Sequence, residues 1–212
     1  DIFPLGGRAG EQASATARGW NLPADQIALD TDPDGPAIRR AVLRSGDWTS
    51  NPVLYAVDSL PEVLESEPGD TPVKLPVTVN GRIGTPGDED VVRFEGRAGA
   101  EIVVEVLARR LNSPLDSVIW LSDPSGKVLA WNDDFEHKEA LLRTDAGTFT
   151  HQADSYLRVK LPQDGSYALR IADAQRAGGE SFGYRLRIGP PRPDFRLAVT
   201  PSALNNRGGI AM

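Results

Sequence analysis

The sequence predicts an all-β protein, because short apolar runs alternate with turn residues along the chain. Its length bears on the number of domains. Short runs of Val, Leu, Ile and Tyr alternate with turn residues, and the 212-residue chain contains 21 glycines and 17 prolines. This texture is typical of many short strands joined by turns. The length is enough for one large β domain or two small ones, each able to bury a core. We expect two modules.

The first 59 residues predict the smaller module. After a glycine-rich turn come strand-like runs at 12–18 and 26–29, and a third at 52–57 whose apolar residues suit a buried strand. Residues 37–44 are ambiguous, because their apolar spacing fits a helical stripe while their short length and their neighbours favour a strand equally.

The sequence changes character at residues 60–72. This stretch is acidic and contains proline and glycine, which is typical of a linker. The chain is therefore divided into a module at 1–59, the linker at 60–72, a second module at 73–190 and a tail at 191–212. The tail holds one strand-like run, 195–199, which cannot form a domain alone. We expect it to be the first strand of a further module.

The second module is predicted to be a jelly-roll-like antiparallel β-sandwich, because short candidate strands follow one another at regular spacing. They are residues 75–79, 91–95, 102–107, 118–121, 128–131, 156–159, 167–171 and 184–188. Asn80-Gly81, Pro124-Ser125-Gly126 and Asp164-Gly165 are residues suited to hairpin turns. Residues 133–155 form the one long interval without a convincing strand, and loops of such length are often functional.

Composition excludes several classes of function. The formal charge is −7 and the arginines are scattered, so nucleic acid is not an expected partner. The absence of cysteine excludes disulfides, zinc–thiolate sites and a cysteine nucleophile. No run approaches the roughly 18 apolar residues that span a bilayer. Because Asp1 opens the chain without Met or a signal-like segment, we expect an excised or processed piece.

A series of short motifs follows between residues 65 and 188. In chain order they are Glu65-Ser-Glu-Pro-Gly-Asp70, Leu75-Pro-Val-Thr-Val-Asn-Gly-Arg-Ile83, Pro86-Gly-Asp-Glu-Asp-Val-Val-Arg-Phe94, Ser113-Pro-Leu-Asp-Ser117, Asp123-Pro-Ser-Gly126, Trp131-Asn-Asp-Asp134, Ala153-Asp-Ser155, Leu161-Pro-Gln-Asp-Gly-Ser-Tyr167 and Tyr184-Arg-Leu186. This order resembles the bacterial pre-peptidase C-terminal domain, a jelly-roll sandwich found beside secreted peptidases. The fuller motif forms look most like those in large surface proteins of planctomycete-type bacteria.

The first module carries a resemblance of its own. Phe3-Pro-Leu-Gly-Gly-Arg-Ala-Gly10, Gly19-Trp-Asn-Leu22 and Ser50-Asn-Pro52 are similar to segments of Ig-like TIG modules. The resemblance implies a smaller N-terminal Ig-like β module, and 59 residues are short for that fold.

The first resemblance also implies a calcium site. In the collagen-binding relatives of this family, a linker Glu-x-Glu-Pro-Asn-Asp run and an Asp before the aromatic strand hold the ion. The residues at the matching positions are Glu65, Glu67, Asp70 and Asp90. Asp88 is added by its proximity, while Gly69 replaces the family's Asn, so that one ligand is lost unless the Gly69 carbonyl serves. The alternative is a solvated acidic linker with ordinary turn aspartates.

A second group of oxygen ligands follows a predicted strand. Asn132, Asp133 and Asp134 are consecutive, and Asp116 and Asp154 are their candidate long-range partners. Calcium takes about six to eight oxygens, so a loop that turns two of these side chains and a carbonyl inward could bind it. Alternatively, Asp116 and Asp154 cap turns through hydrogen bonds while Asn132 and Asp133 stabilise the loop exit.

The sequence predicts no catalytic group. His137 and His151 are the imidazole bases of the chain, and Ser155 beside Asp154 suggests a triad with His151, but no nucleophile-elbow or oxyanion-loop pattern accompanies them. A carboxylate pair for glycoside hydrolysis is uninformative among 30 acidic residues. The sequence has no His-Glu-x-x-His run, P-loop or dinucleotide-binding glycine fingerprint.

The predicted function is therefore a non-catalytic accessory, spacer or binding module of a larger exported protein, stabilised by calcium. We expect a monomer in an extracellular, cell-surface or periplasmic location, with neighbouring domains of the parent chain as partners. The alternative is a polysaccharide- or protein-binding module that uses a sheet face or the Trp131 loop. Trp131 and Phe135 flank the Asn-Asp-Asp run and could present a flat surface to such an extracellular polymer.

Overall fold

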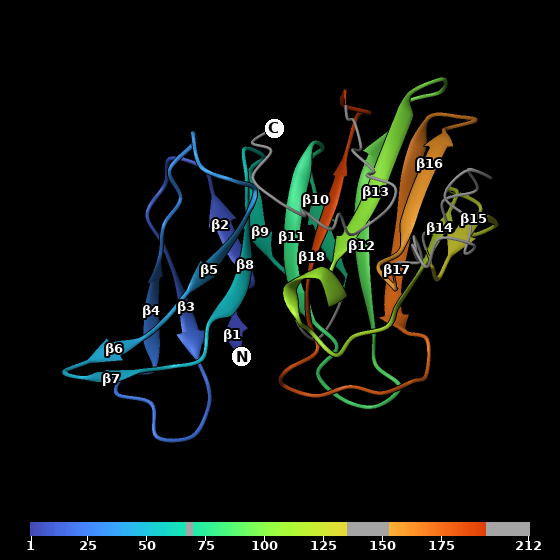
Figure 1. The fold of residues 1–212 in the computed structure, drawn as a ribbon. Helices are drawn as coiled ribbons and strands as arrows, with labels where there is room; N and C mark the ends of the chain where they lie inside the picture. The colour runs from blue at the N-terminus through green and yellow to red at the C-terminus, as the bar shows by residue number, and fades with distance from the viewer. Residues whose placement is uncertain (67–69, 135–152, 194–212) are drawn as a thin grey trace, which may run out of the picture.

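The computed structural model describes residues 1–66, 70–134 and 153–193. Its strands form two modules that lie side by side, the smaller N-terminal one in blue and the larger one from green to red (Figure 1). The all-β prediction is confirmed. No helix in these ranges is long and apolar enough to cross a membrane.

The N-terminal module contains two three-stranded sheets and a small hairpin. One sheet has the order β1 (Ile2–Phe3), β3 (Ala13–Ala17), β4 (Gln26–Leu29), the other the order β2 (Gly6–Arg8), β8 (Val53–Asp58), β5 (Ile38–Ala41), and the hairpin is β6 (Arg44–Ser45) with β7 (Trp48–Thr49). The runs predicted at 12–18, 26–29 and 52–57 are confirmed as β3, β4 and β8. The ambiguous stretch at 37–44 contains a strand, β5.

Buried and exposed residues alternate along β3 and β4, and the buried ones form part of the core of the N-terminal module. Ala15, Ala17, Ile27 and Leu29 are buried while their neighbours in each strand are exposed or half-buried. Tyr55 of β8 closes the core, and its hydroxyl donates to the Asp30 carbonyl at 3.0 Å. Period-two burial of this kind is what a half-buried strand predicts.

The larger module is a sandwich of two five-stranded sheets. The sheet called here the β12 sheet has the order β10 (Thr71–Val73), β12 (Glu89–Gly96), β17 (Gly165–Asp173), β14 (Ser117–Ser122), β15 (Val128–Asn132). The β18 sheet has the order β16 (Tyr156–Lys160), β13 (Glu101–Leu107), β18 (Gly183–Gly189), β11 (Val77–Arg82), β9 (Glu62–Leu64). The strands predicted for this module are confirmed, in order, as β11 to β18. The candidate strand at 195–199 lies outside the described residues.

Both sheets end in a short strand from the stretch predicted as a linker. Within 60–72, β9 pairs parallel to β11 in one sheet, and β10 pairs parallel to β12 in the other. This segment therefore passes from one sheet to the other at the edge of the sandwich, and the two edge pairs depart from the predicted antiparallel pattern. Each strand is three residues long, which gives too little alternation to recognise in sequence.

The turn predicted at Asn80-Gly81 is wrong, because both residues lie inside β11. Gly81 pairs with Tyr184 of β18, and a Cβ atom at Gly81 would lie 2.2 Å from the Tyr184 hydroxyl oxygen. The glycine therefore permits close packing. Asp164-Gly165 is also not a hairpin turn, since it connects β16 to β17 in the opposite sheet. The prediction at 124–126 is confirmed by the antiparallel pairing of β14 with β15.

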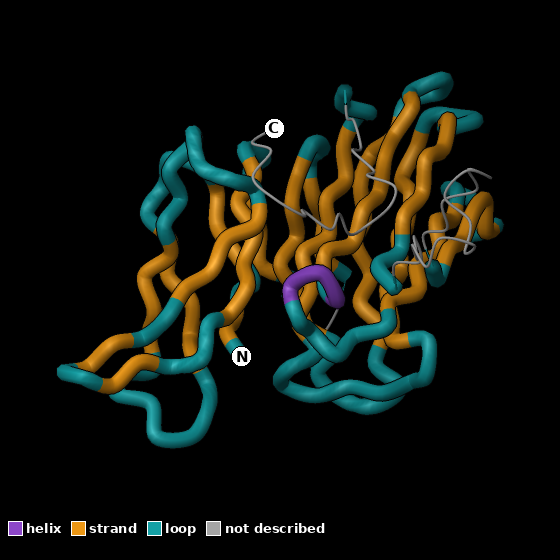
Figure 2. Tube along the Cα trace, viewed as in Figure 1, coloured by secondary structure: helices purple, strands orange, loops and turns teal. Residues whose placement is uncertain are grey.

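The modules share buried contacts. A 3-10 helix, η1 (Arg109–Leu111), follows β13 and lies where the two modules meet, in purple in Figure 2. Its Leu111 is 3% exposed and belongs to the core of the N-terminal module. Nearby, the Arg82 guanidinium carbon lies 4.1 Å from the centroid of the Phe3 ring, a cation–π contact between the modules.

Candidate functional site

The first predicted group of carboxylates lies at the edge where the chain passes between the sheets. Asp90 of β12 is 5% exposed, and its Oδ2 accepts a 2.7 Å hydrogen bond from the Tyr184 hydroxyl. Asp88, in the preceding turn, accepts from the backbone N–H groups of Gly84 at 2.8 Å and Glu89 at 3.0 Å. The Glu65 carboxylate accepts from the backbone of β11 at 3.4 Å.

These carboxylates act together on Tyr184. Burial raises the pKa of the Tyr184 hydroxyl well above its ordinary value, and the negative charges of Asp90, Glu65 and Asp88 raise it further. Two carboxylates at the start of β12 and one that follows β9 thus act on the same hydroxyl. These three carboxylates are the part of the first predicted group that the structure brings together.

The remaining members of that group are placed differently. Asp70 forms an ion pair with Arg93 of β12, and both side chains are largely exposed. Glu67 and Gly69 lie outside the described residues. Their contribution to a calcium site therefore stays a prediction.

The donor chemistry fits a hard cation, but the described carboxylates fall short in number. Calcium prefers about six to eight oxygens, and Glu65, Asp88 and Asp90 supply carboxylate oxygens only. Within 1–66, 70–134 and 153–193, no three acidic or histidine side chains are placed to hold a metal ion. A complete calcium site here would need further oxygens from residues 67–69 or from water.

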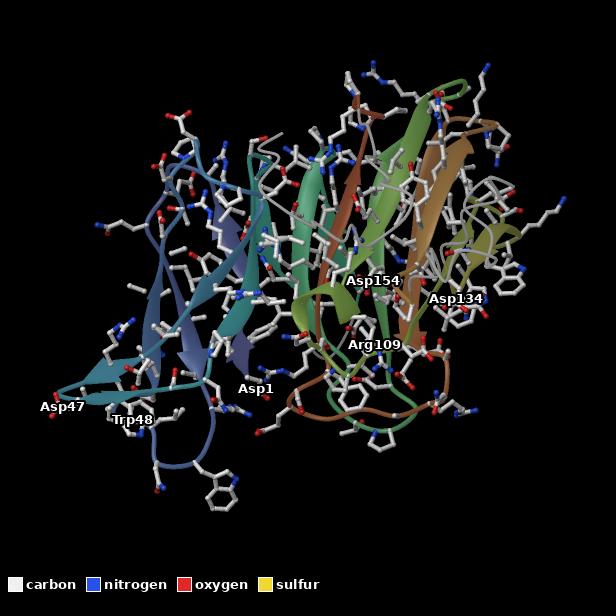
Figure 3. All side chains as sticks on the ribbon, in the orientation of Figure 1. Asp1, Asp47, Trp48, Arg109, Asp134 and Asp154 are labelled. Carbon is white, nitrogen blue, oxygen red and sulfur yellow. The ribbon has the colours of Figure 1, made fainter. Side chains whose placement is uncertain are left out.

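Asp154, from the second predicted group, is held by the protein itself. It lies beside η1 in Figure 3, is 1% exposed, and accepts from the backbone N–H groups of Ala108, Arg109 and Arg110 at 3.1, 2.7 and 3.2 Å. The Arg110 Nε donates a fourth bond, at 2.8 Å. These contacts make Asp154 the anchor of the 3-10 helix.

The other members of the second group also make local hydrogen bonds. Asn132 accepts from the Tyr156 backbone N–H at 2.8 Å and donates to the Asp134 carbonyl at 2.9 Å. The backbone carbonyl of Asp133 accepts from Ser155 at 3.3 Å. Together these bonds fasten the end of β15 to the start of β16.

Asp116 belongs to a turn organised by a residue that the sequence analysis missed. Asp173, 4% exposed at the end of β17, accepts from the backbone N–H groups of Asp116, Gln175 and Ala177 at 3.0, 3.0 and 2.9 Å. The only signal in the sequence was an Asp at the end of an apolar strand, which is common in turns that have no ligand.

The serine of the rejected triad is buried and already hydrogen-bonded. Ser155 is completely buried, and its hydroxyl donates to the Ser117 carbonyl at 2.6 Å. A nucleophile must reach its substrate, so this serine is structural. His137 and His151 lie outside the described residues.

Two tryptophans stand on the outer face of the β12 sheet. Trp131 of β15 is 59% exposed and pairs with Trp120 of β14, which in turn pairs with Arg170 of β17. The Arg170 guanidinium carbon lies 5.5 Å from the centroid of the Trp120 ring. Directly opposed residues share a face of a sheet, so Trp131, Trp120 and Arg170 form one row, the tryptophan row. Phe135 lies outside the described residues.

The comparison with curated proteins finds a relative. Over 128 residues the chain is 35% identical to a probable subtilase-type serine protease of Deinococcus radiodurans. The match covers 57% of this chain and 15% of that protein, so the chain spans a small part of its relative's length. No protein-family model matches the sequence.

The comparison with solved structures finds distant likenesses. One is the pre-peptidase C-terminal domain of collagenase from Bacillus anthracis, with 16% identity, a TM-score of 0.41, and coverage of 57% of this chain and 94% of that one. Another is a periplasmic inhibitor of g-type lysozyme from Aeromonas hydrophila, with 14% identity, a TM-score of 0.41, and coverage of 60% and 97%. The domain named in the first structure is the one that the sequence motifs resemble.

Proposed function

We propose that this chain is a non-catalytic accessory segment of a larger exported protein, and that its two modules keep a fixed arrangement and so act as a rigid spacer between the neighbouring domains. The observation that carries the proposal is the shared packing of the two modules. Leu111 of the larger module is buried in the core of the smaller one, so the pair is joined by apolar contact as well as by the chain. Apolar contact between modules opposes their relative motion.

Polar contacts across the same boundary support the fixed arrangement. Arg185 of β18 is 1% exposed, and a Cβ atom at Gly6 of β2 would lie 2.9 Å from its guanidinium carbon. The backbone of β2 therefore lies directly against this buried side chain. Arg18 of the smaller module also forms an ion pair with Glu180 of the larger one.

The relationship to a long protease supports an accessory role. Since the match covers 15% of the Deinococcus protein, it concerns one segment of a much larger chain. We propose the same setting here: export to an extracellular, cell-surface or periplasmic location as part of a larger protein.

A distance measurement between the modules tests the fixed arrangement. The chain has no cysteine, so cysteines introduced at the exposed positions Ser14 and Lys127 can be spin-labelled without background. Pulsed electron paramagnetic resonance should give one narrow distance distribution. A broad distribution would mean that the modules move independently and would overturn the spacer role.

We also propose that calcium stabilises the edge of the sandwich. Its ligands would be Glu65, Asp88 and Asp90, together with further oxygens from residues 65–70. The action of all three carboxylates on the Tyr184 hydroxyl supports this. A bound cation would reduce the repulsion between these carboxylates and would link the chain at Glu65 to the start of β12.

Calorimetric titration of calcium into the metal-free chain tests the calcium proposal. Asp90→Asn should weaken binding by about tenfold or more, whereas Asp123→Asn, in the exposed β14–β15 turn, should leave it unchanged. Absence of calcium binding to the unmodified chain, or equal binding by Asp90→Asn, would overturn the calcium proposal and leave the spacer proposal standing.

The tryptophan row favours a second candidate function, the binding of an extracellular polymer. Flat aromatic faces on a sheet suit the stacking of sugar rings or of prolyl side chains. In sedimentation assays with insoluble polysaccharides and fibrillar collagen, Trp131→Ala should remove binding, while Val128→Ala, which also changes an exposed residue of β15, should retain it. Failure of the unmodified chain to sediment with any of these polymers would exclude this candidate.

A further inference from the structure

A cavity of about 220 Å³ lies at the junction of the two modules. One wall is formed by β5 and β8 of the smaller module, and the other by the outer face of the β18 sheet. Its charged lining residues are Arg110, Arg185, Arg187, Arg192, Asp58 and Glu105. The cavity contains no residue of the carboxylate group around Tyr184 or of the tryptophan row.

Two of these arginines have their hydrogen bonds satisfied. Arg185 donates to Glu62 at 2.5 Å and to Asn80 at 2.8 Å. Arg110 donates to Asp154 at 2.8 Å, to Glu105 at 3.0 Å and to the Val106 carbonyl at 2.6 Å. Their guanidinium groups need no further acceptor.

The other two share a single carboxylate at long range. Arg187 Nε lies 3.8 Å from Asp58, and Arg192 lies 3.7 Å from the same carboxylate, both beyond hydrogen-bonding distance. Arg192 reaches Glu105 only at 4.0 Å, and Glu105 is already bonded to Arg110. The Arg187 Nη2 donates to the Pro190 carbonyl at 3.2 Å, whereas the buried Arg187 Nε has no acceptor within hydrogen-bonding distance among the described residues. Arg192 is 56% exposed and keeps donors free for a ligand of the cavity.

Thr78 adds a third donor to the same place. It pairs directly with Arg187 across β11 and β18, lines the cavity and is 2% exposed. Neither the Thr78 hydroxyl nor the Arg187 Nε, both buried, has a hydrogen-bond partner among the described residues. Buried donors of this kind are rare in folded proteins and call for an acceptor.

We propose that the junction cavity binds a small oxyanion, a phosphate-like group or a carboxylate, through Arg187, Arg192 and Thr78. An oxyanion supplies several acceptors to converging donors, and guanidinium groups bind such anions with paired hydrogen bonds. Its negative charge would also offset the repulsion between the two guanidinium groups.

Burial and the neighbouring Arg192 lower the pKa of Arg187, and the negative charges of Asp58 and Glu105 oppose this shift without cancelling it. Because the cavity has one wall from each module, the anion would be a ligand of the junction itself. Its binding would stabilise the arrangement of the modules in proportion to its concentration.

The test is isothermal titration of the whole chain with inorganic phosphate, with sulfate and with acetate, each at the same ionic strength set by sodium chloride. Saturable binding of one of these anions is expected, and the comparison of phosphate with acetate separates a phosphate-like ligand from a carboxylate. Arg192→Gln and Thr78→Val should each weaken binding, raising the dissociation constant by about tenfold or more.

Arg158→Gln is the matched control, since Arg158 is 59% exposed against 56% for Arg192 and lies on β16, away from the cavity. It should bind as the unmodified chain does. No saturable binding of any of the three anions would overturn the proposal and indicate a cavity filled by water. Equal binding by the unmodified chain, Arg192→Gln and Thr78→Val would overturn it as well.

Discussion

At the scale of single residues, buried polar side chains organise the sandwich. Asp154, Asp173 and Arg185 are each less than 5% exposed, and each makes several hydrogen bonds. Burying a polar group costs free energy unless it is paired, so each of these residues fixes the segments that supply its partners. A sequence shows the residue type at such positions but not the partners that explain it.

Replacement of Asp154 by Asn should destabilise the protein by about 3 kcal/mol, because a buried charged partner of Arg110 and of three backbone N–H groups is lost. Urea unfolding at neutral pH measures this change. Asp164→Asn is the control, since Asp164 caps one exposed N–H group, that of Ala98, and should cost about 1 kcal/mol or less. Equal effects of the two substitutions would contradict the anchoring role of Asp154.

Stability should fall at alkaline pH because of Tyr184. Its pKa is raised in the folded state by burial and by Asp90, so its contribution is fully present below the unfolded-state pKa of about 10 and is lost as pH rises toward the folded pKa. Urea unfolding from pH 8 to pH 11 should show a shallower loss of stability for Tyr184→Phe than for the unmodified chain. Identical slopes would show that Tyr184 does not carry the effect.

At the scale of elements, strands β11 to β18 of the sandwich could be predicted because each has at least five residues and contains apolar residues between turn residues. The edge strands β9 and β10 could not, since each has three residues and depends on a partner strand for its conformation. The Asn80-Gly81 pair was misread because glycine serves close packing as well as turns.

The candidate sites were predictable to a similar extent. The family resemblance implied that Glu65 and Asp90 belong together, and Asp88 was added by its proximity, whereas the meeting point at Tyr184 depends on the pairing of β11 with β18. Two of the four junction arginines, Arg185 and Arg187, alternate with Leu186 and Ile188 along β18. That pattern predicts which face they occupy, but not that a second module covers it.

Gly81→Ala tests the close approach of β11 and β18. The added methyl group would meet the completely buried Tyr184 ring, so we expect a loss of about 1–3 kcal/mol of unfolding free energy from overpacking. Gly19→Ala, where the added atom would make an ordinary 3.4 Å contact, should be nearly neutral. Thermal unfolding of the pair measures the difference, and a neutral Gly81→Ala would mean that the two strands lie farther apart.

At the scale of the whole molecule, the two modules behave in this account as one unit, because the larger one supplies part of the smaller one's core. Leu111→Ala should therefore cost about 2–5 kcal/mol, the range for truncating a buried leucine. The loss should appear as faster amide exchange in β8 of the other module. The control is Leu64→Ala at a 62% exposed position, and exchange that rises only in the larger module would contradict the shared core.

The most direct measurement is calorimetric unfolding of the whole chain, first in excess EDTA and then in millimolar calcium, with magnesium as the control. A single transition for both modules, raised by several degrees in calcium but not in magnesium, is the predicted result, because a ligand that binds only the folded state stabilises it. Two separate transitions that calcium leaves unchanged would contradict both the fixed two-module unit and its stabilisation by calcium.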